Sequence, residues 1–94
     1  MIGIYSIYTP TGFYRQSLKL IRKHPIIEDA LREIKEILIQ DPYNTSRVYQ
    51  IKKLSDVKSC DGQWRIRHGV YRLRYDIDGK TVILRTIKPR DKAY

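Results

Sequence analysis

The stretch that decides the fold is Gln63–Tyr75, which reads QWRIRHGVYRLRY. Arginines alternate with large apolar residues on both sides of His68-Gly69, and such alternation is the period-two pattern of a β-strand with one buried face. We therefore predict strands over residues 63–68 and 70–77, separated by a break at Gly69. Their apolar side chains should face a core, and their arginines should face the other side of the sheet.

Further strands are predicted on either side of this stretch. Asp78-Gly79 favours a hairpin turn, because both central residues of a type I′ turn need positive φ. Lys80–Ile87 would then be the last strand, Arg47–Leu54 an earlier one, and the polar run Ser55–Gly62 a loop. In the last strand two sets of side chains should point to opposite faces: Val82, Leu84 and Thr86, and Ile83, Arg85 and Ile87.

The first quarter of the chain predicts a strand followed by a helix. Ile2–Tyr8 is rich in Ile and Tyr and is predicted as a strand. Thr9 should cap a helix that has Pro10 at its first position and runs to about Lys23. His24-Pro25 would end that helix.

A second helix has the most regular pattern in the sequence. Apolar residues recur at helical spacing and form one stripe: Ile27, Ala30, Leu31, Ile34, Ile37 and Leu38. Glu28 and Asp29 lie in the first turn, where the helix dipole favours negative charge, and Asp41-Pro42 ends the helix. Such a stripe is typical of a core-facing helix, and the short turn between the helices predicts an antiparallel helical hairpin.

Together these elements predict an α+β fold. The N-terminal strand and the helical hairpin should pack on one face of a twisted, mostly antiparallel four-stranded sheet, because nothing else in the chain can cover that face. A chain of 94 residues should form one domain, residues 1–94. The other face of the sheet would be left open.

The charge is strongly uneven along the chain. The 19 Lys and Arg exceed the 10 Asp and Glu by nine, and residues 47–94 alone hold 13 Lys and Arg against 5 Asp and Glu. Such asymmetry favours a polyanionic partner, which could be nucleic acid, an anionic membrane surface or an acidic protein.

Several classes of site are disfavoured by the residues present. Cys60 is the single cysteine, so the sequence predicts neither an internal disulfide nor a cysteine-rich zinc site, and a catalytic thiol is not expected. His24 and His68 lie 44 positions apart, and we expect no metal site and no cofactor. No apolar stretch reaches the length of a membrane span, and the first residues do not form a secretory leader, so we expect a cytoplasmic protein without a membrane partner.

The arginines of the deciding stretch suggest a chemistry. If the apolar sides of the strands meet the helices, four guanidinium groups converge on the open face: Arg65, Arg67, Arg72 and Arg74. They repel one another, an anionic ligand would relieve the repulsion, and the planar guanidinium suits bidentate contact with phosphate. Tyr49 and Tyr94 are candidates for stacking with unpaired bases.

Cleavage of RNA at such a site would not need a metal. The ribose 2′-hydroxyl can attack the adjacent phosphate, with cations to stabilise the developing charge, a base for the hydroxyl and an acid for the leaving oxygen. Arginine is a poor base, because its pKa stays above about 12. Four sources of a base remain open, namely Tyr94, His68, a lysine and the RNA itself.

The string from Trp64 to Tyr75, together with the C-terminal Arg90…Tyr94, strongly resembles the RelE/ParE toxin superfamily of bacterial and archaeal toxin–antitoxin pairs. The close match covers about residues 47–94, and the helical hairpin before it agrees in type and order. The resemblance implies a RelE-like mRNA interferase that enters the ribosomal A site, cuts mRNA without metal and has a cognate antitoxin. ParE-type members instead poison DNA gyrase.

The resemblance also assigns roles by position. Arg65 and Arg67 match the paired basic residues of the family's first motif strand, and Arg72 matches the arginine at the scissile phosphate. Arg90 matches a C-terminal arginine, and Tyr94 matches a tyrosine proposed as general base or stacking partner. We expect a second set to hold ribosomal RNA or the mRNA backbone: Lys52, Lys53, Arg74 and Arg85.

The chain departs from the family at two places. Some relatives have lysines at the positions of Arg65 and Arg67, and many have a histidine at the position of Pro89, so the proton-transfer groups are not assigned. His68 could replace them, although an exposed turn histidine is the simpler interpretation. A ParE-like gyrase inhibitor and a non-catalytic RNA-binding relative remain as alternative functions.

Overall fold

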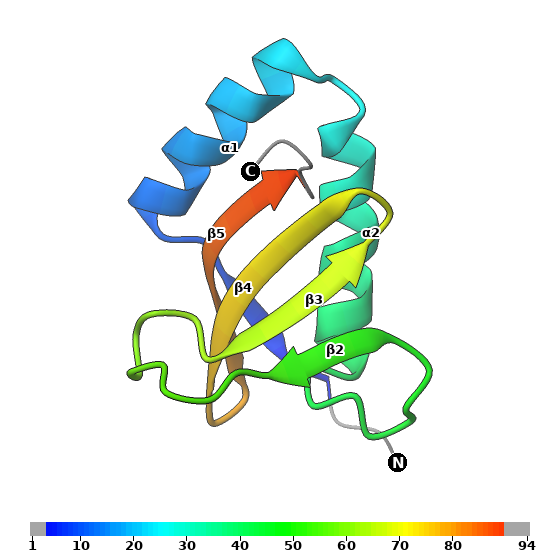
Figure 1. Ribbon diagram of the computed structural model, residues 1–94, viewed down its shortest axis with the longest axis vertical. Coiled ribbons are helices and arrows are strands. Elements are labelled where there is room, and N and C mark those ends of the chain that lie inside the picture. Colours follow the sequence, from blue (N-terminus) through cyan, green and yellow to red (C-terminus); the bar gives the residue numbers. More distant parts are fainter. Residues whose placement is uncertain (1–3, 90–94) are drawn as a thin grey trace.

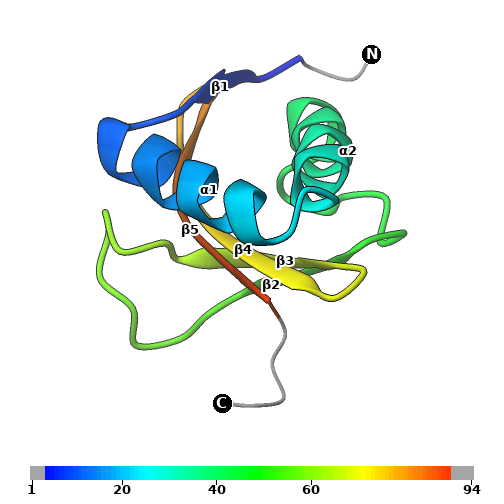
Figure 2. The ribbon, with the colours of Figure 1, turned by 90° about the horizontal axis from the view of Figure 1, so that it is seen from above.

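The computed structural model describes residues 4–89, and these form two helices and a five-stranded sheet (Figure 1). The elements follow in the order β1 (Ser6–Tyr8), α1 (Thr11–Lys23), α2 (Ile27–Gln40), β2 (Gln50–Lys53), β3 (Trp64–His68), β4 (Tyr71–Asp78) and β5 (Thr81–Pro89). Figure 2 shows both helices on the same side of the sheet, so its other face is open. The predicted α+β class is confirmed.

The sheet has one strand more than we predicted. Its order is β1-β5-β4-β3-β2, with β1 parallel to β5 and every other pair antiparallel. The N-terminal strand therefore extends the sheet instead of packing on its face. The Ser6 amide donates to the Lys80 carbonyl at 2.8 Å, and the pairing protects a β5 edge that would otherwise be exposed.

Both helices form where they were predicted, but the start of α1 differs. Pro10, not Thr9, occupies the N-cap, and no side chain caps the helix. The extended backbone of Pro10 lets its carbonyl accept the Tyr14 amide at 2.9 Å, which begins the helical hydrogen bonds. The second helix begins at Ile27 as predicted and ends when the Asp41 amide reaches the Ile37 carbonyl at 2.8 Å.

The strand after the helices is shorter than Arg47–Leu54. Arg47 has a φ of 62°, which no strand residue adopts. The Asn44 side chain donates to the Tyr49 carbonyl and accepts the Tyr49 amide, at 2.9 and 3.1 Å, and so replaces the missing ladder bonds. Pairing with β3 starts only at Gln50.

Both hairpin turns have a glycine with positive φ at their first central position. Asp78 pairs with Thr81, so the central residues of the β4–β5 turn are Gly79 and Lys80, one position later than predicted. Gly79 has a φ of 60°, and a glycine at the first central position is typical of a type II′ turn, not of type I′. Gly69, with a φ of 61°, occupies the first central position of the turn between β3 and β4.

The core lies between the helices and the inner face of the sheet. The predicted stripe of α2 supplies Ile27, Leu31, Ile34 and Leu38, and the strands supply Ile66, Tyr71, Leu73, Tyr75, Val82, Leu84 and Ile87. Burying each large aliphatic side chain contributes about 1.5–3 kcal/mol. The fully buried Tyr75 hydroxyl donates to the Pro42 carbonyl at 2.7 Å, and burial, followed by the charge of Asp41, raises the pKa of Tyr75. None of the helices within residues 4–89 is long and apolar enough to cross a membrane.

Candidate functional site

Two rows of side chains cross the face of the sheet that the helices leave open. The strand register aligns Gln50, Arg67, Arg72 and Lys88 in one row and Lys52, Arg65, Arg74 and Thr86 in the next. Residues opposite one another in an antiparallel ladder share a face, so all eight point away from the helices. The four arginines of the deciding stretch therefore converge as the alternation predicts.

The convergence places like charges directly opposite one another. Arg65 faces Arg74 across β3 and β4, and Arg67 faces Arg72 in the neighbouring row. Opposed side chains lie about 4.5–5.5 Å apart at Cβ, and like charges at that separation destabilise the sheet. Burial, followed by the charges of Arg67, Arg72 and Arg74, lowers the pKa of Arg65. The fold keeps these charges together at a cost in stability.

A hollow of about 370 Å³ opens between the arginines. The residues that line it are Leu54, Arg65, Arg72, Arg74, Thr86 and Lys88. Among these described residues none carries a carboxylate, so the lining has cationic groups, one hydroxyl and one aliphatic side chain. Such a lining suits an anion with several acceptor oxygens.

Two donors in the hollow lack partners. The Nε atoms of Arg65 and Arg72 are buried and make no hydrogen bond within residues 4–89. Leaving a buried donor unsatisfied costs about 1–3 kcal/mol, and more where the group is charged. A pair of arginines with unsatisfied donors beside a cationic hollow is the sharpest sign of a ligand, because an anion on these guanidinium groups would offset part of that cost.

The carboxylate of Asp76 holds together the segments beside the hollow. Asp76 is buried and accepts three hydrogen bonds, from the Gly62 amide at 3.0 Å, the Gln63 amide at 2.9 Å and Arg85 Nε at 2.7 Å. Burial alone would raise the pKa of Asp76, but the bonds from Gln63, Arg85 and Gly62 outweigh it and lower that pKa. We call this cluster the Asp76 clamp; it ties the loop before β3 to β4 and β5.

The clamp also holds one arginine of the hollow. Arg74 Nε donates to the Gly62 carbonyl at 3.0 Å. Gly62 has a φ of 82°, and a Cβ added there would lie 2.8 Å from the Arg74 Cβ. The close approach that positions Arg74 therefore requires glycine at residue 62.

A bulge changes the facing of the last strand. Arg74 pairs with Thr86 and Tyr75 pairs with Leu84, so Arg85 is an extra residue between them. Ile87 is consequently buried with Val82 and Leu84, and Thr86 turns to the arginine face. Our prediction that Thr86 shares a face with Val82 and Leu84 was therefore wrong.

The structure separates some of the predicted RNA-binding residues. Lys52 lies opposite Arg65 on the open face, but Lys53 lies opposite Trp64 on the other face, with its Nζ 5.9 Å from the centre of that ring. Arg85 is engaged by Asp76 in the clamp, with the Arg85 side chain 24% exposed. Arg90 and Tyr94 lie outside the described residues.

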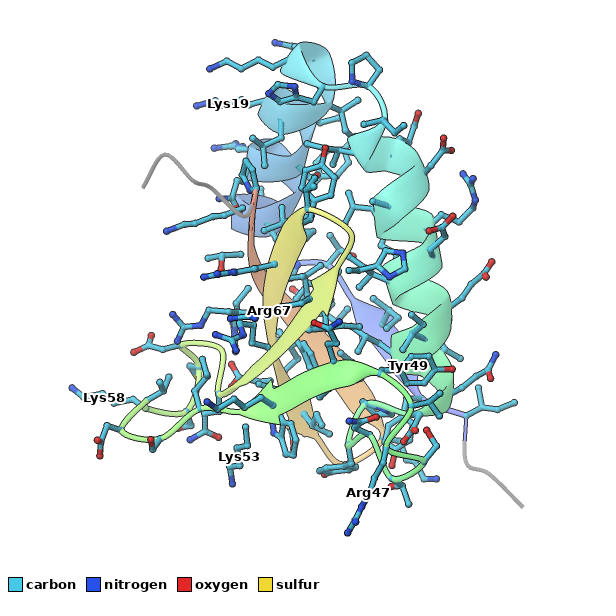
Figure 3. The ribbon with its side chains drawn as sticks, turned by 45° about the vertical axis from the view of Figure 1, so that its right-hand side comes forward. Lys19, Arg47, Tyr49, Lys53, Lys58 and Arg67 are labelled. Carbon is cyan, nitrogen blue, oxygen red and sulfur yellow. The ribbon has the colours of Figure 1, made fainter. Side chains whose placement is uncertain are left out.

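The alternative proton-transfer and stacking residues lie elsewhere. His68 is on the helix side of β3, where its Nε2 is 2.7 Å from Glu33 Oε1, so His68 cannot reach the arginine face. Figure 3 shows Tyr49 beside α2, whereas Arg67 lies on the part of the sheet turned away from that helix. Cys60 is exposed in the loop before β3. In the part of the chain from residue 4 to residue 89, no three His, Cys, Asp or Glu side chains gather as a metal site would need.

Reasoning from sequence missed three residues of this site. Thr86 was assigned to the wrong face, Asp76 was not singled out, and Lys88 was placed in the tail because the last strand was predicted to end at Ile87. The signal for Lys88 was the continued alternation of polar and apolar residues from Thr86 to Lys88. No sequence pattern marks the bulge that places Thr86 and Lys88 on the arginine face.

Comparison with solved structures identifies a close likeness in fold. A chain of the toxin–antitoxin complex RelBE2 from Mycobacterium tuberculosis superposes with a TM-score of 0.71 and 28% identity, over 93% of this chain and 99% of that chain. Among curated proteins, a cytochrome P450 monooxygenase, TRI1 of Fusarium sporotrichioides, is 39% identical over 57 residues. Those residues are 60% of this chain but 10% of the length of that protein, so the monooxygenase activity does not transfer to this chain. No family model matches the sequence.

Proposed function

We propose that this chain, which is a RelE-like toxin in fold and sequence pattern, cleaves mRNA on the ribosome and so inhibits translation. The structural likeness to a chain of a toxin–antitoxin complex supports the toxin assignment. One observation favours an enzyme that binds phosphate over a fold kept only for protein contacts. Arg65 and Arg72 line a hollow whose described residues carry no carboxylate, and the buried Nε of each makes no hydrogen bond within residues 4–89.

In the proposed reaction the ribose 2′-hydroxyl attacks the adjacent phosphorus. A bond from the 2′-oxygen to phosphorus forms, the bond to the 5′-oxygen breaks, and the products are a 2′,3′-cyclic phosphate and a 5′-hydroxyl. Negative charge accumulates on the phosphoryl oxygens in the transition state, and donors fixed in advance stabilise it. Arg65 and Arg72, which line the hollow, would do this, and Arg67 lies beside Arg72 in the same row.

The remaining residues extend the proposal. Lys52 and Arg74 flank Arg65 in its row and would hold the RNA backbone. Lys53 and Arg85, which the structure turns elsewhere, would contribute at most to the charge around the site. Arg90 would add a further cation and Tyr94 would take the proton of the 2′-hydroxyl, both on the strength of the family resemblance.

A cognate antitoxin is the expected protein partner. The structural neighbour is itself described as a toxin–antitoxin complex. A segment that silences this chain by covering the arginine face should be acidic, because it must neutralise several unpaired guanidinium groups.

Induction in a bacterial host tests the proposal directly. Primer extension on a translated reporter mRNA should reveal new 5′ ends within codons, and Arg72→Ala should abolish both these ends and the growth arrest. Arg22→Ala, an exposed position on α1, is the matched control and should behave as wild type. Arrested growth with intact mRNA would contradict the proposal, and covalent gyrase–DNA complexes would establish the ParE-like alternative.

A further inference from the structure

The hollow contains one basic side chain that differs in kind from its neighbours. Lys88 lies on β5 directly opposite Arg72, and it lines the hollow together with Arg65, Arg74 and Thr86. The residue is exposed, so its ammonium group can reach a ligand without rearrangement of the core. Its position comes from the bulge at Arg85, which turns the even-numbered end of β5 to the arginine face.

The proposed reaction needs a proton donor for its leaving group, the 5′-oxygen. When the bond between phosphorus and the 5′-oxygen breaks, the leaving alkoxide must gain a proton. Arginines stabilise charge but do not release protons near neutral pH, because their pKa stays above about 12. A threonine hydroxyl is likewise too weak an acid for this step.

Two other titratable groups near the hollow do not fill this role, and Lys52, on the same face, is not among the residues that line it. The carboxylate of Asp76 is occupied by three donors within the clamp. His68 lies on the helix side of β3, beside Glu33. Of the described residues that line the hollow, Lys88 alone carries an ammonium group, and an ammonium is a stronger acid than a guanidinium.

We propose that Lys88 is the general acid of the cleavage step, an inference that rests on the proposed ribonuclease function. Its ammonium group donates one proton to the departing 5′-oxygen as the 2′-oxygen bonds to phosphorus. The proton of the 2′-hydroxyl leaves to water, and the neutral amine then regains a proton from solvent. The step needs no oxidant, metal or other reagent.

The decisive variant is Lys88→Arg, which keeps the positive charge but replaces the ammonium group by a guanidinium, a weaker acid. The measurement is the single-turnover rate on purified ribosomes programmed with a short synthetic mRNA. We expect that rate to fall about 100-fold or more, as is typical when a general acid is lost. Affinity for the programmed ribosome should be unchanged, because the charge is retained. Lys19→Arg, an exposed lysine on α1 (Figure 3), should match wild type.

A second substrate separates proton donation from other roles. In an mRNA with sulfur in place of the 5′-bridging oxygen at the cleaved position, the leaving thiolate needs no proton. Lys88→Arg and Lys88→Ala should therefore cleave this mRNA at nearly the wild-type rate. A variant that only misplaces the phosphate would be slow on both substrates.

Each outcome bears on one of the two proposals. If wild type cleaves neither mRNA, the proposed function fails and the role of Lys88 fails with it. If wild type cleaves both and Lys88→Arg equals it on the ordinary mRNA, only the role of Lys88 is overturned. Equal loss on both substrates also overturns it. Thermal unfolding of each variant, compared with wild type, establishes that the variants are folded.

Discussion

At the scale of single residues, the site is assembled from groups that stabilise the fold poorly. Arg65 lies between other arginines, and its Nε has no acceptor within residues 4–89. Water would satisfy this group better than the folded sheet does, so folding must overcome the loss. Residues that cost stability and fill a hollow are expected at a functional site, where ligand binding offsets the cost.

Replacing Arg65 with methionine should stabilise the protein and inactivate it. Arg65→Met removes a partly buried cation from a repulsive cluster while keeping similar volume, so the free energy of unfolding should rise by roughly 1 kcal/mol. Urea unfolding measures the change, and the primer-extension assay should show no cleavage. Arg22→Met on α1 should leave both readouts near wild type. A less stable Arg65→Met protein would mean that this guanidinium makes a net stabilising contact.

Gly62 should be far less tolerant of substitution than Gly69. Both have positive φ, but a Cβ at Gly62 would lie 2.8 Å from the Arg74 Cβ, whereas a Cβ at Gly69 would meet nothing within 4 Å. Gly69→Ala should therefore cost about 1 kcal/mol from backbone strain alone, and Gly62→Ala about 2–4 kcal/mol. Urea unfolding of the two variants gives the comparison, and equal losses would show that the contact with Arg74 relaxes freely.

At the scale of elements, hydrophobic periodicity predicted the helices and the facing of β3 and β4, whereas hydrogen bonding determined how the other segments pair. The stripe of α2 and the alternation in β3 and β4 were sufficient to place the core and the arginine face, because both patterns follow from simple geometry. Three features depended instead on hydrogen-bond partners that periodicity does not mark. These are the parallel pairing of β1 with β5, the early turn at Asn44 and the bulge at Arg85. Lys88 was missed because the last strand was predicted to end at Ile87, and the face on which Lys88 lies also depends on the bulge.

The Asp76 clamp should make stability depend on pH in the acid range. The pKa of Asp76 is lowered in the folded protein, so its contribution is fully present above the unfolded pKa of about 3.9 and is lost as the pH falls towards the folded value. Asp76→Asn should cost about 2–4 kcal/mol at neutral pH, because Arg85 and two backbone amides lose a charged acceptor.

The difference between wild type and Asp76→Asn should therefore shrink below about pH 4. Urea unfolding of both proteins between acid and neutral pH measures it. Asp56→Asn, in the exposed part of the loop before β3, is the matched control and should show no such convergence. A difference that stays constant across the range would contradict a charged Asp76 in the clamp.

At the scale of the whole molecule, the two sides of the sheet differ in role. One side carries the helices (Figure 2) and the core, and the other carries the two rows of mainly basic side chains. The excess charge of the second half of the chain is thus partly concentrated on one face. That arrangement gives an approaching polyanion a preferred orientation, and the attraction should weaken with salt.

Salt titration should distinguish the two sides. Binding of single-stranded RNA should weaken linearly on a log–log plot against salt, with a slope of about −0.7 for each phosphate contact. Arg67→Gln, on the arginine face, should make the slope shallower by about 0.7, and Arg22→Gln, on α1, should leave it unchanged. Fluorescence anisotropy at several salt concentrations provides the slopes. Equal slopes for the two variants would mean that RNA does not lie on the arginine face.

The parallel pair of β1 and β5 has a consequence for how the protein is made. Ser6 pairs with Thr81, and α1 also packs on β5, so β1 and α1, which are synthesised before β5, have no docking strand until residues 81–89 follow. Such long-range closure is slow, and the early segments stay exposed meanwhile to proteases and chaperones. Each new molecule therefore passes through an interval in which the sheet that carries the arginines is incomplete. A nonsense mutation before Thr81 would make that interval permanent.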